Sequence, residues 1–258
     1  MWCRCSEVRA MRDTIRLRIF RGDASGGEER EYEVKTFPGM VVLDAVHQIQ
    51  NEQDGTLACR WNCKAAKCGS CSAEINGHPR LMCKSRVEEF YDASGLIRVH
   101  PIKTFPVVKD LVTDVSWNYK VAETIPPLQT AKDAPRPLRM AQDDVERAQE
   151  FRKCIECFLC QTVCHVLRDH NRTDAYYGPR YMVKIAALDM HPCDTLERRS
   201  FLRQTGGVGF CNITKCCQEV CPEHIHITDN AIIPLKERVA DEYYDPIRML
   251  VRRIRGLK

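Results

Sequence analysis

Three groups of cysteines, each with its own spacing, are the residues of this sequence best suited to chemistry. They are Cys63-x4-Cys68-x2-Cys71-x11-Cys83, Cys154-x2-Cys157-x2-Cys160-x3-Cys164 and Cys211-x5-Cys217-x3-Cys221-Pro222. The first spacing is typical of a plant-type [2Fe–2S] cluster. The second is typical of a bacterial [4Fe–4S] cluster whose fourth cysteine ligates the other cluster of a pair. Together the three groups predict a protein that carries electrons.

Zinc and disulfide bonds are the two other common uses of cysteine. A structural zinc takes four ligands, often in two short pairs, whereas here four cysteines follow one another closely and the third group ends in Cys-Pro. Disulfide frameworks are typical of small secreted chains, and 258 residues can bury a core without them. No apolar stretch of a signal peptide is found in the N-terminal sequence MWCRCSEVRAMRD. We therefore expect the thiols in a reducing compartment, where they are available to metal.

Composition and missing motifs exclude several classes of function. A net charge of +4 is too small to indicate nucleic-acid binding, and no apolar run reaches the roughly 18 to 20 residues that cross a bilayer. The sequence has no GxGxxG dinucleotide loop, no Walker motif and no nucleophile with an adjacent base. We expect the chain to oxidise no organic substrate by itself, so that a flavin or other hydride acceptor lies on another chain.

The first cysteine group predicts all four ligands of a [2Fe–2S] cluster. The ligands are Cys63, Cys68, Cys71 and Cys83. Three of them lie on one short loop, so their sulfurs can converge on two irons, and Cys83 is expected to arrive from a following strand. Gly69 can adopt a positive φ and let backbone N–H groups approach the cluster. Cys59 competes with Cys63, but only Cys63 completes the spacing.

The second and third groups are two copies of one motif. The second copy has the same spacing as the first: its positions are 211, 214, 217 and 221, and those of the first copy are 154, 157, 160 and 164. In such pairs the last cysteine of each run ligates the other cluster. The sequence therefore predicts a [4Fe–4S] cluster held by Cys154, Cys157, Cys160 and Cys221. It predicts a second cluster held by Cys164, Cys211 and Cys217.

Thr214 occupies the position in the second copy that corresponds to Cys157, a predicted thiolate ligand in the first copy. One corner of that cluster then has no protein sulfur and loses its iron easily, so we predict a [3Fe–4S] cluster there. Cys216 is an alternative fourth ligand, but adjacent side chains on a helical turn point roughly 100° apart. This makes Cys216 the weaker alternative. By default it is, like Cys59 and Cys193, a small buried hydrophobic residue.

The N-terminal third has the pattern of β-structure. Apolar and charged residues alternate over Thr14–Phe20 and again around Tyr32 and Val34, as in half-buried strands. The polar, glycine-rich stretch 21–30 between them is predicted to be the turn of a hairpin. An apolar helical stripe follows over 41–49. Strand, strand, helix and cysteine loop is the order of a β-grasp ferredoxin.

The rest of the chain is predicted to contain short strands followed by helices. The strands are 72–75, 80–83 and 96–101, and the helices are 143–153, 179–190, 195–204 and 229–240. The connector 125–137 is rich in proline and is expected to be extended, with little packing of its own. The basic, amphipathic tail 245–258 suits an anionic membrane surface or a partner subunit. Cys3 and Cys5 lie in a segment without a recognisable pattern.

These features predict the α+β class with two domains. A β-grasp, plant-type ferredoxin domain with the [2Fe–2S] cluster is placed at 12–118. An all-helical, two-cluster domain similar to bacterial ferredoxins is placed at 119–258, with the connector 125–137 at its start.

With eleven cysteines in this order, the chain resembles a bacterial form of the iron–sulfur subunit of succinate dehydrogenase and fumarate reductase. These enzymes make up the respiratory complex II family. The resemblance covers residues 12 to about 245, including RWNCKAAKCGSCSAEINGHPRLMC and EFRKCIECFLCQTVCH. It implies that a flavoprotein subunit takes two electrons from succinate as its FAD is reduced. Single electrons then pass through [2Fe–2S], [4Fe–4S] and [3Fe–4S] to a quinone in a membrane anchor. It also implies a position on the cytoplasmic face of the bacterial plasma membrane, held by anchor subunits.

The sequence departs from the family pattern beside the last cluster. Family members have proline directly after the ligand matching Cys164, tryptophan five residues after that ligand, and histidine directly after the ligand matching Cys211. This chain has His165, Asp169 and Asn212 at these places. We take these three residues as candidates for the quinone site.

Two alternatives stay open. A fumarate reductase would run the electrons in the opposite direction, which the sequence does not decide because flavin, cluster and quinone potentials set it. The chain could also be an electron-transfer subunit of another oxidoreductase complex. Such subunits usually carry two complete cubane motifs, so Thr214 and the first cysteine loop both count against this alternative.

Overall fold

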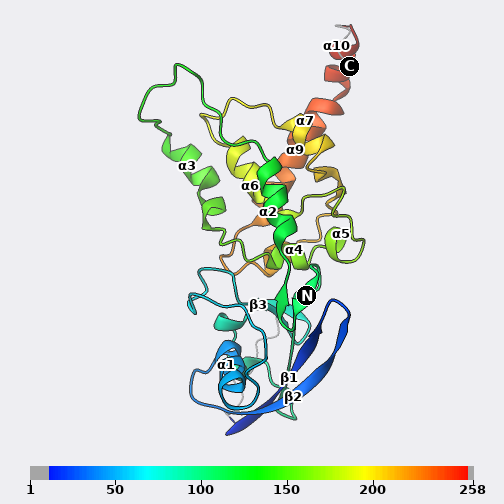
Figure 1. Ribbon diagram of the computed structural model, residues 1–258. Helices are drawn as coiled ribbons and strands as arrows, with labels where there is room; N and C mark the ends of the chain where they lie inside the picture. Colours follow the sequence, from blue (N-terminus) through cyan, green and yellow to red (C-terminus); the bar gives the residue numbers. More distant parts are fainter. Residues whose placement is uncertain (1–11, 255–258) are drawn as a thin grey trace. The chain divides into compact units, whose positions relative to one another are not determined.

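The computed structural model describes residues 12–254, so Cys3 and Cys5 lie outside the described part of the chain. The chain divides into two compact units. They comprise the residues through Val115 with Ile155–Thr162, and Ser116–Cys154 with the residues from Val163 onward. The first unit holds the strands and the second is helical, so the fold belongs to the predicted α+β class (Figure 1).

A five-stranded mixed sheet forms the centre of the first unit (Figure 1). Its strands are β1 (Thr14–Asp23), β2 (Gly26–Lys35), β3 (Ser72–Ile75), β4 (His78–Leu81) and β5 (Leu96–His100). The order is β2-β1-β5-β3-β4, and only the β1–β5 pair is parallel. Helix α1 (Val42–Glu52) packs against β2. This is the β-grasp arrangement that the sequence predicts.

Alternating burial explains the position of β1. Ile15, Leu17 and Ile19 are at most 1% exposed, while Arg16 and Arg18 between them are only partly buried. Full burial of an aliphatic side chain of this size stabilises the fold by about 1.5–3 kcal/mol. A slip of one residue would bring both arginines into the core, so the pattern fixes the register of β1.

The hairpin between β1 and β2 is tighter than the sequence indicates. Strand β1 runs to Asp23 and β2 begins at Gly26, so only two residues form the turn and the predicted turn over 21–30 is wrong. Gly22 and Gly27 face each other in the ladder, and a Cβ on Gly22 would lie 2.3 Å from the carbonyl oxygen of Gly26. These glycines therefore allow close approach of the two strands and do not form a loop.

Strand β4 comes two residues earlier than predicted. It pairs with β3 up to Leu81, and Met82–Lys84 forms a 3-10 turn. Cys83 therefore lies in this turn and not on a strand, which corrects the prediction. The apolar residues Leu81 and Met82 are both buried, so the sequence does not mark where the strand ends. Two more strands, β6 (Val107–Lys109) and β7 (Val112–Thr113), pair in a separate small sheet.

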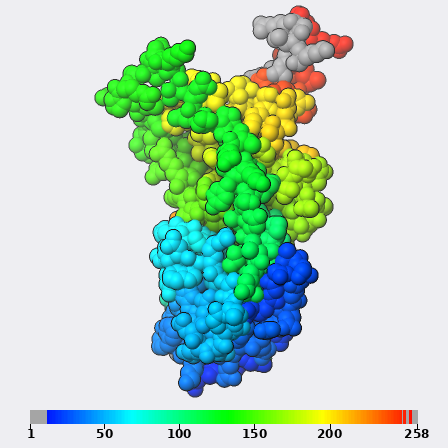
Figure 2. All heavy atoms as spheres, viewed as in Figure 1, coloured from blue at the N-terminus to red at the C-terminus, as the bar shows by residue number. Residues whose placement is uncertain are grey.

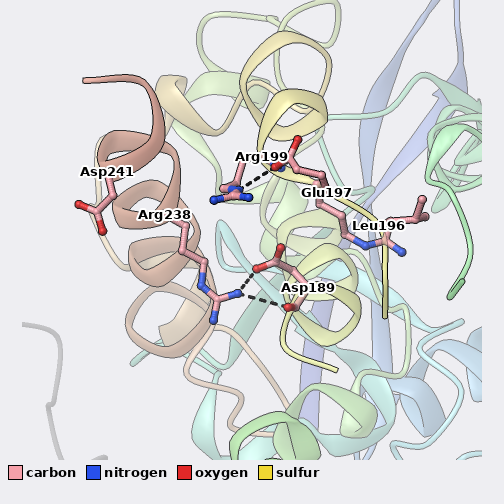
Figure 3. Close-up of a pocket in the computed structure, with 7 residues that line it drawn as sticks. Asp189, Leu196, Glu197, Arg199, Arg238 and Asp241 are labelled. Atoms are coloured by element: carbon pink, nitrogen blue, oxygen red, sulfur yellow. Dashed lines mark hydrogen bonds and ion pairs between the residues drawn. The ribbon is translucent and has the colours of Figure 1, made fainter. Parts of the chain in front are cut away.

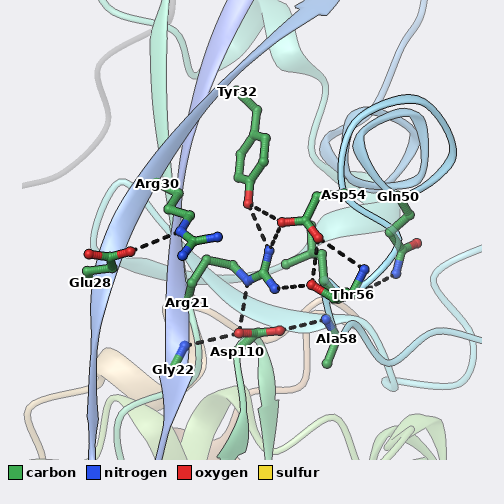
Figure 4. Close-up of polar contacts among 11 residues, drawn as sticks. Arg21, Gly22, Glu28, Arg30, Tyr32, Gln50, Asp54, Thr56, Ala58 and Asp110 are labelled. Atoms are coloured by element: carbon green, nitrogen blue, oxygen red, sulfur yellow. Dashed lines mark hydrogen bonds and ion pairs between the residues drawn. The ribbon is translucent and has the colours of Figure 1, made fainter.

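A buried ion-pair network fixes the segment that leads into the first cysteine loop (Figure 4). The Arg21 side chain on β1 is 9% exposed, donates from Nε to Asp110 at 3.0 Å, and also contacts Asp54 and Tyr32. The second carboxylate oxygen of Asp110 accepts the N–H of Ala58 at 2.8 Å. Asp110 therefore joins the chain just before the cysteine loop to the sheet.

We expect Asp110→Asn to destabilise the first unit by about 3 kcal/mol, because breaking one partner of a buried ion pair costs about 3–5 kcal/mol. Asparagine also replaces one carboxylate oxygen by an NH2 group, which cannot accept the hydrogen bond that this oxygen receives in Asp110. The midpoint of anaerobic urea unfolding measures the loss. Glu31→Gln is the matched control, since it removes the same charge from a surface pair with Arg16 and Arg18 and is expected to change stability little. Equal losses from both variants would contradict the role of the network.

Helices form the second unit (Figure 1). They are α2 (Ser116–Thr124), α3 (Gln142–Gln149), α5 (His165–Arg168), α6 (Pro179–Asp189), α7 (Arg199–Gln204), α8 (Cys216–Glu219), α9 (Ile233–Tyr243) and α10 (Pro246–Ile254), with a π-helical segment at Ile227–Ile232. Helix α6 is the core helix, since Tyr181, Met182 and Ile185 are at most 2% exposed. It begins with Pro179, as predicted.

The proline-rich connector packs against the second unit, contrary to the expectation that it has little packing. Arg198, which is 2% exposed, pairs with Asp194 at 2.6 Å and donates to the carbonyl oxygens of Pro126 and Pro127 at 2.9 and 3.0 Å. Residues 194–198 are not helical, and α7 starts at Arg199 and not at residue 195. The last predicted helix also starts later, as α9, after a π-helical segment.

A polar groove lies between the end of α6, the start of α7 and α9 (Figure 3). Arg238 on α9 pairs with Asp189 on α6. Arg199 pairs with Glu197 at 2.7 Å and with Glu242 at 2.9 Å. Each arginine that lines the groove has an acidic partner, so these charges tie the helices together.

The last helix exposes an apolar face. Ile247, Leu250 and Ile254 in α10 are 59% to 76% exposed, at a spacing that places them on one side of the helix. Figure 2 shows this helix in red, standing out from the yellow and orange surface of the second unit. Residues 255–258 of the predicted basic tail lie outside the described part. Within residues 12–254, no helix is long and apolar enough to cross a membrane.

Candidate iron–sulfur sites

Backbone N–H groups gather around the sulfurs of the first cysteine loop. Lys64 and Ala66 have φ values of 53° and 55°, and left-handed residues of this kind turn neighbouring N–H groups toward a shared anion. The N–H of Ala65 donates to Cys63 Sγ, and the N–H of Ala66 donates to Cys83 Sγ, each at 3.3 Å. Such hydrogen bonds stabilise thiolate charge, as iron ligands require.

The same loop brings the remaining predicted [2Fe–2S] ligands together. The N–H of Cys83 donates to Cys71 Sγ at 3.5 Å. Burial opposes ionisation of Cys68, but hydrogen bonds with Ser70 and Cys63 outweigh it and lower the pKa of this thiol to about 7. Burial raises the pKa of Cys71 to about 12. The four thiols are thus connected through the backbone of one loop and of the 3-10 turn that contains Cys83.

Gly69 is needed where the second cysteine group approaches this loop. Its φ is +69°, which confirms the sequence prediction, and a Cβ on Gly69 would lie 2.6 Å from the Cα of Cys157. Ser72 Oγ donates to the carbonyl oxygens of both residues at 2.9 Å. The chain at Cys157, just before helix α4 (Leu159–Thr162), therefore packs directly onto the first cysteine loop.

The second and third cysteine groups share one backbone conformation. Glu156 and Phe158 have φ values of 54° and 60°, and Ile213 and Lys215, each 57 positions later, have φ values of 61° and 64°. The four-residue helices α4 and α8 follow at the same offset. This agreement supports the sequence alignment of the two runs, in which Thr214 takes the place of Cys157.

Three predicted ligands line one small cavity in the second unit. They are Cys164, Cys211 and Cys217. Thr214 and Cys216 line the same cavity. Three thiols around one space, with a threonine at the fourth place, form the donor set expected of a cluster with three protein thiolates. The residues present therefore fit a [3Fe–4S] cluster.

Cys216 lies closer to this cavity than side-chain directions on a helix suggest. Its Sγ lies 3.7 Å from His165 Nε2 and 3.7 Å from the carbonyl oxygen of Thr214. The Nδ1 atom of His165 contacts Asp169 at 2.8 Å. His165 and Asn212 line the cavity, whereas Asp169 reaches it only through His165. Cys216 thus lies at the cavity together with the three predicted ligands, and its role as an alternative fourth ligand stays a prediction.

The four cysteines of the predicted [4Fe–4S] cluster are divided between the two units. Cys157 and Cys160 are buried in the first, while Cys154 and Cys221 belong to the second. The N–H of Ile225 donates to Cys221 Sγ at 3.4 Å. This ligand set stays a prediction. Among the described residues, no three His, Cys, Asp or Glu side chains form a site for a single metal ion.

Sequence reasoning missed two hydroxyl groups beside the three-cysteine cavity. Thr228 Oγ1 lies 3.4 Å from Cys217 Sγ, and Tyr176 lines the cavity. Both side chains are at most 1% exposed. Neither residue belongs to a cysteine motif, so their position depends on how α6 and the π-helical segment pack.

Two iron–sulfur family models match this chain. Residues 16–120 match the family model for a 2Fe-2S iron-sulfur cluster binding domain, and residues 150–225 match the model for a 4Fe-4S dicluster domain. The chain is therefore an iron–sulfur protein with an N-terminal [2Fe–2S] domain and a C-terminal dicluster domain.

Several relatives are similar to this chain over most of its length. The fumarate reductase iron-sulfur subunit of Haemophilus influenzae is 30% identical over 71% of this chain and 76% of its own length. The succinate dehydrogenase iron-sulfur subunit of Bacillus subtilis is 31% identical over 83% of this chain and 88% of its own. A chain of the Mycobacterium smegmatis Sdh1 complex is 57% identical, with a TM-score of 0.88, over 91% of this chain and 98% of that one. Three archaeal relatives are longer, and the chain covers 41% to 46% of them.

This chain belongs to the family of iron–sulfur subunits of succinate dehydrogenase and fumarate reductase. Its function is electron transfer within an oxidoreductase complex of that type.

Proposed function

We propose that the chain carries electrons from an FAD-containing flavoprotein subunit to quinone at a membrane anchor, in a succinate:quinone oxidoreductase. The observation that carries this proposal is the cavity with three thiols and Thr214, because a three-iron centre in addition to two complete clusters is what the family resemblance implies. When bound, the clusters accept and release single electrons at potentials set by their ligands and surroundings.

The ligand sets and domain limits of the sequence prediction are part of the proposal. The [2Fe–2S] set lies in the domain 12–118, and the [4Fe–4S] and [3Fe–4S] sets lie in the domain 119–258. The N–H groups at the first loop and the shared backbone of the other two cysteine runs support these assignments.

The first cysteine loop is proposed to face the flavoprotein. Cys63 is exposed, and Trp61, two residues earlier in the chain, is 46% exposed. Lys64 Nζ lies 4.8 Å from the centre of the Trp61 ring, and Arg60 adds a further positive charge. Aromatic residues and arginine are enriched at protein interfaces. An exposed ligand surrounded by these side chains suits electron entry from a partner protein.

His165 and Asn212 are proposed to contact quinone, and Asp169 to orient His165. His165 and Asn212 line the cavity of the three-cysteine site. The contact between His165 Nδ1 and Asp169 fixes the imidazole ring. With Nδ1 held in this way, Nε2 is the ring atom left to face a bound molecule or Cys216.

We also propose that anchor subunits hold the protein on the cytoplasmic face of the plasma membrane. The exposed apolar face of α10, followed by basic residues in the sequence, supports a contact near the membrane surface.

Fumarate reduction is the second candidate, because relatives of both names match over most of the chain. Purification of the native complex and assay with succinate plus quinone, and with fumarate plus reduced quinone, tests both directions. Co-purification of a flavoprotein and membrane subunits is expected. Purification without either would favour another oxidoreductase complex.

The holoprotein is expected to contain about nine irons, from one cluster of each of the three types. Iron and acid-labile sulfide analysis of anaerobically purified protein gives the count, and EPR of the oxidised protein detects the three-iron centre. A count of about ten irons without a three-iron signal would mean that Cys216 or an added ligand fills the open corner.

A further inference from the structure

The hydroxyl of Tyr176 is buried without a partner. The Tyr176 side chain is 0% exposed, and its oxygen has no hydrogen-bond partner among the described residues. Buried polar groups in folded proteins nearly always have a partner, which can be an ion or cofactor. Tyr176 therefore indicates a group that completes its hydrogen bond.

This hydroxyl belongs to the wall of the three-cysteine cavity. A phenol hydroxyl is an ordinary hydrogen-bond donor and is protonated at neutral pH. The hydroxyl lies close to Cys211, in an arrangement that does not meet the geometry of a hydrogen bond. The O–H group is thus a donor placed beside the sulfurs that would hold the cluster.

The backbone holds Tyr176 in this place. Its N–H donates to the carbonyl oxygen of Arg172 at 3.1 Å, and α6 begins three residues later. On the other side, a Cβ on Gly207 would lie 1.8 Å from the carbonyl oxygen of Ala175, so the chain at Gly207 approaches this segment closely. A ring held between such neighbours has little freedom to turn its hydroxyl elsewhere.

We propose that Tyr176 donates a hydrogen bond to a sulfur of the three-iron centre and thereby raises its reduction potential. The inference rests on the proposed [3Fe–4S] assignment. Reduction adds negative charge to the centre, and a hydrogen-bond donor stabilises the more negative state. Hydrogen bonds to sulfur are among the factors that set the potentials of such clusters. Thr228, 3.4 Å from Cys217 Sγ, places a second hydroxyl beside the same site.

Tyr176→Phe tests this role in the holoprotein, because it removes only the hydroxyl. We expect the reduction equilibrium of the three-iron centre to become about tenfold less favourable, which is about 59 mV for one electron. A redox titration followed by the EPR signal of the oxidised three-iron centre measures the midpoint potential. Tyr177→Phe is the matched control, since the adjacent hydroxyl contacts Thr124 at 2.9 Å and does not line the cavity. Equal potentials in Tyr176→Phe and wild type would overturn the inference.

A second measurement does not depend on the stability of the variant. In wild-type protein exchanged into D2O, ENDOR on the three-iron signal is expected to show a coupled deuteron that Tyr176→Phe lacks and Tyr177→Phe retains. A wild-type three-iron signal without any such deuteron would overturn the role of Tyr176 and leave the cluster assignment intact. Absence of the three-iron signal from wild type would overturn the cluster assignment, and the inference with it.

Discussion

Cys83→Ser is expected to remove the [2Fe–2S] centre and to lower succinate-driven quinone reduction by more than about 100-fold, since changes that merely surround metal ligands already cost about 10- to 100-fold. Cys83 Sγ accepts the N–H of Ala66, and the N–H of Cys83 donates to Cys71 Sγ. The residue therefore connects the 3-10 turn to the cysteine loop at two points. EPR of the reduced protein measures the centre, and stopped-flow reduction by succinate measures electron entry.

Cys59→Ser is the matched control for this prediction. Cys59 lies four residues before Cys63, but burial raises the pKa of its thiol to about 12, and it is outside the predicted ligand set. The control is expected to keep the [2Fe–2S] signal. If Cys83→Ser instead lost the other clusters and kept the [2Fe–2S] signal, the assignment of ligands would be wrong.

Thr214→Cys is expected to convert the three-iron centre to a [4Fe–4S] cluster. The shared backbone of the two cysteine runs puts residue 214 at the place of Cys157, and Thr214 lines the cavity with the three predicted ligands. A fourth thiolate adds negative charge and lowers the potential of the centre. Each 59 mV or so of lowering makes the one-electron step into this centre about tenfold less favourable.

The effect of Thr214→Cys should appear at the quinone end of the chain. Quinone reduction is expected to slow, while succinate oxidation with an artificial acceptor near the flavin is spared. Thr214→Ser keeps the hydroxyl without adding a thiol, so it should retain the three-iron signal. An unchanged three-iron signal at full occupancy in Thr214→Cys would mean that residue 214 does not face the open corner, and the alignment of the two runs would have to be abandoned.

Local patterns of the sequence predict β1, α1 and three thiols of the last site. Alternation of buried and polar residues placed β1, and the apolar stripe placed α1 within a few residues. Cysteine spacing alone predicts that Cys164, Cys211 and Cys217 are ligands of one cluster. Such patterns work because strand and helix periods determine which side chains share a face.

Features that depend on distant residues could not be predicted in this way. The glycine-rich stretch after β1 looks like a loop, but its glycines let two strands approach each other. Arg198 binds the carbonyl oxygens of the connector some 70 positions earlier in the chain, a contact without a sequence signal. Tyr176 reaches the cavity only because α6 and the chain at Gly207 hold it there. Each case depends on packing between segments that are far apart in sequence.

The left-handed residues of the cysteine loops link the folding of this protein to its supply of iron and sulfide. Six of them are not glycine, namely Lys64, Ala66, Glu156, Phe158, Ile213 and Lys215. Each such conformation costs about 1–3 kcal/mol and persists only where the surroundings enforce it. Because the binding energy of a metal group is also folding energy, cluster insertion is what makes these loop shapes favourable. We therefore expect cluster loading and folding of this chain to be coupled, so that a shortage of iron lowers the amount of folded protein as well as its activity.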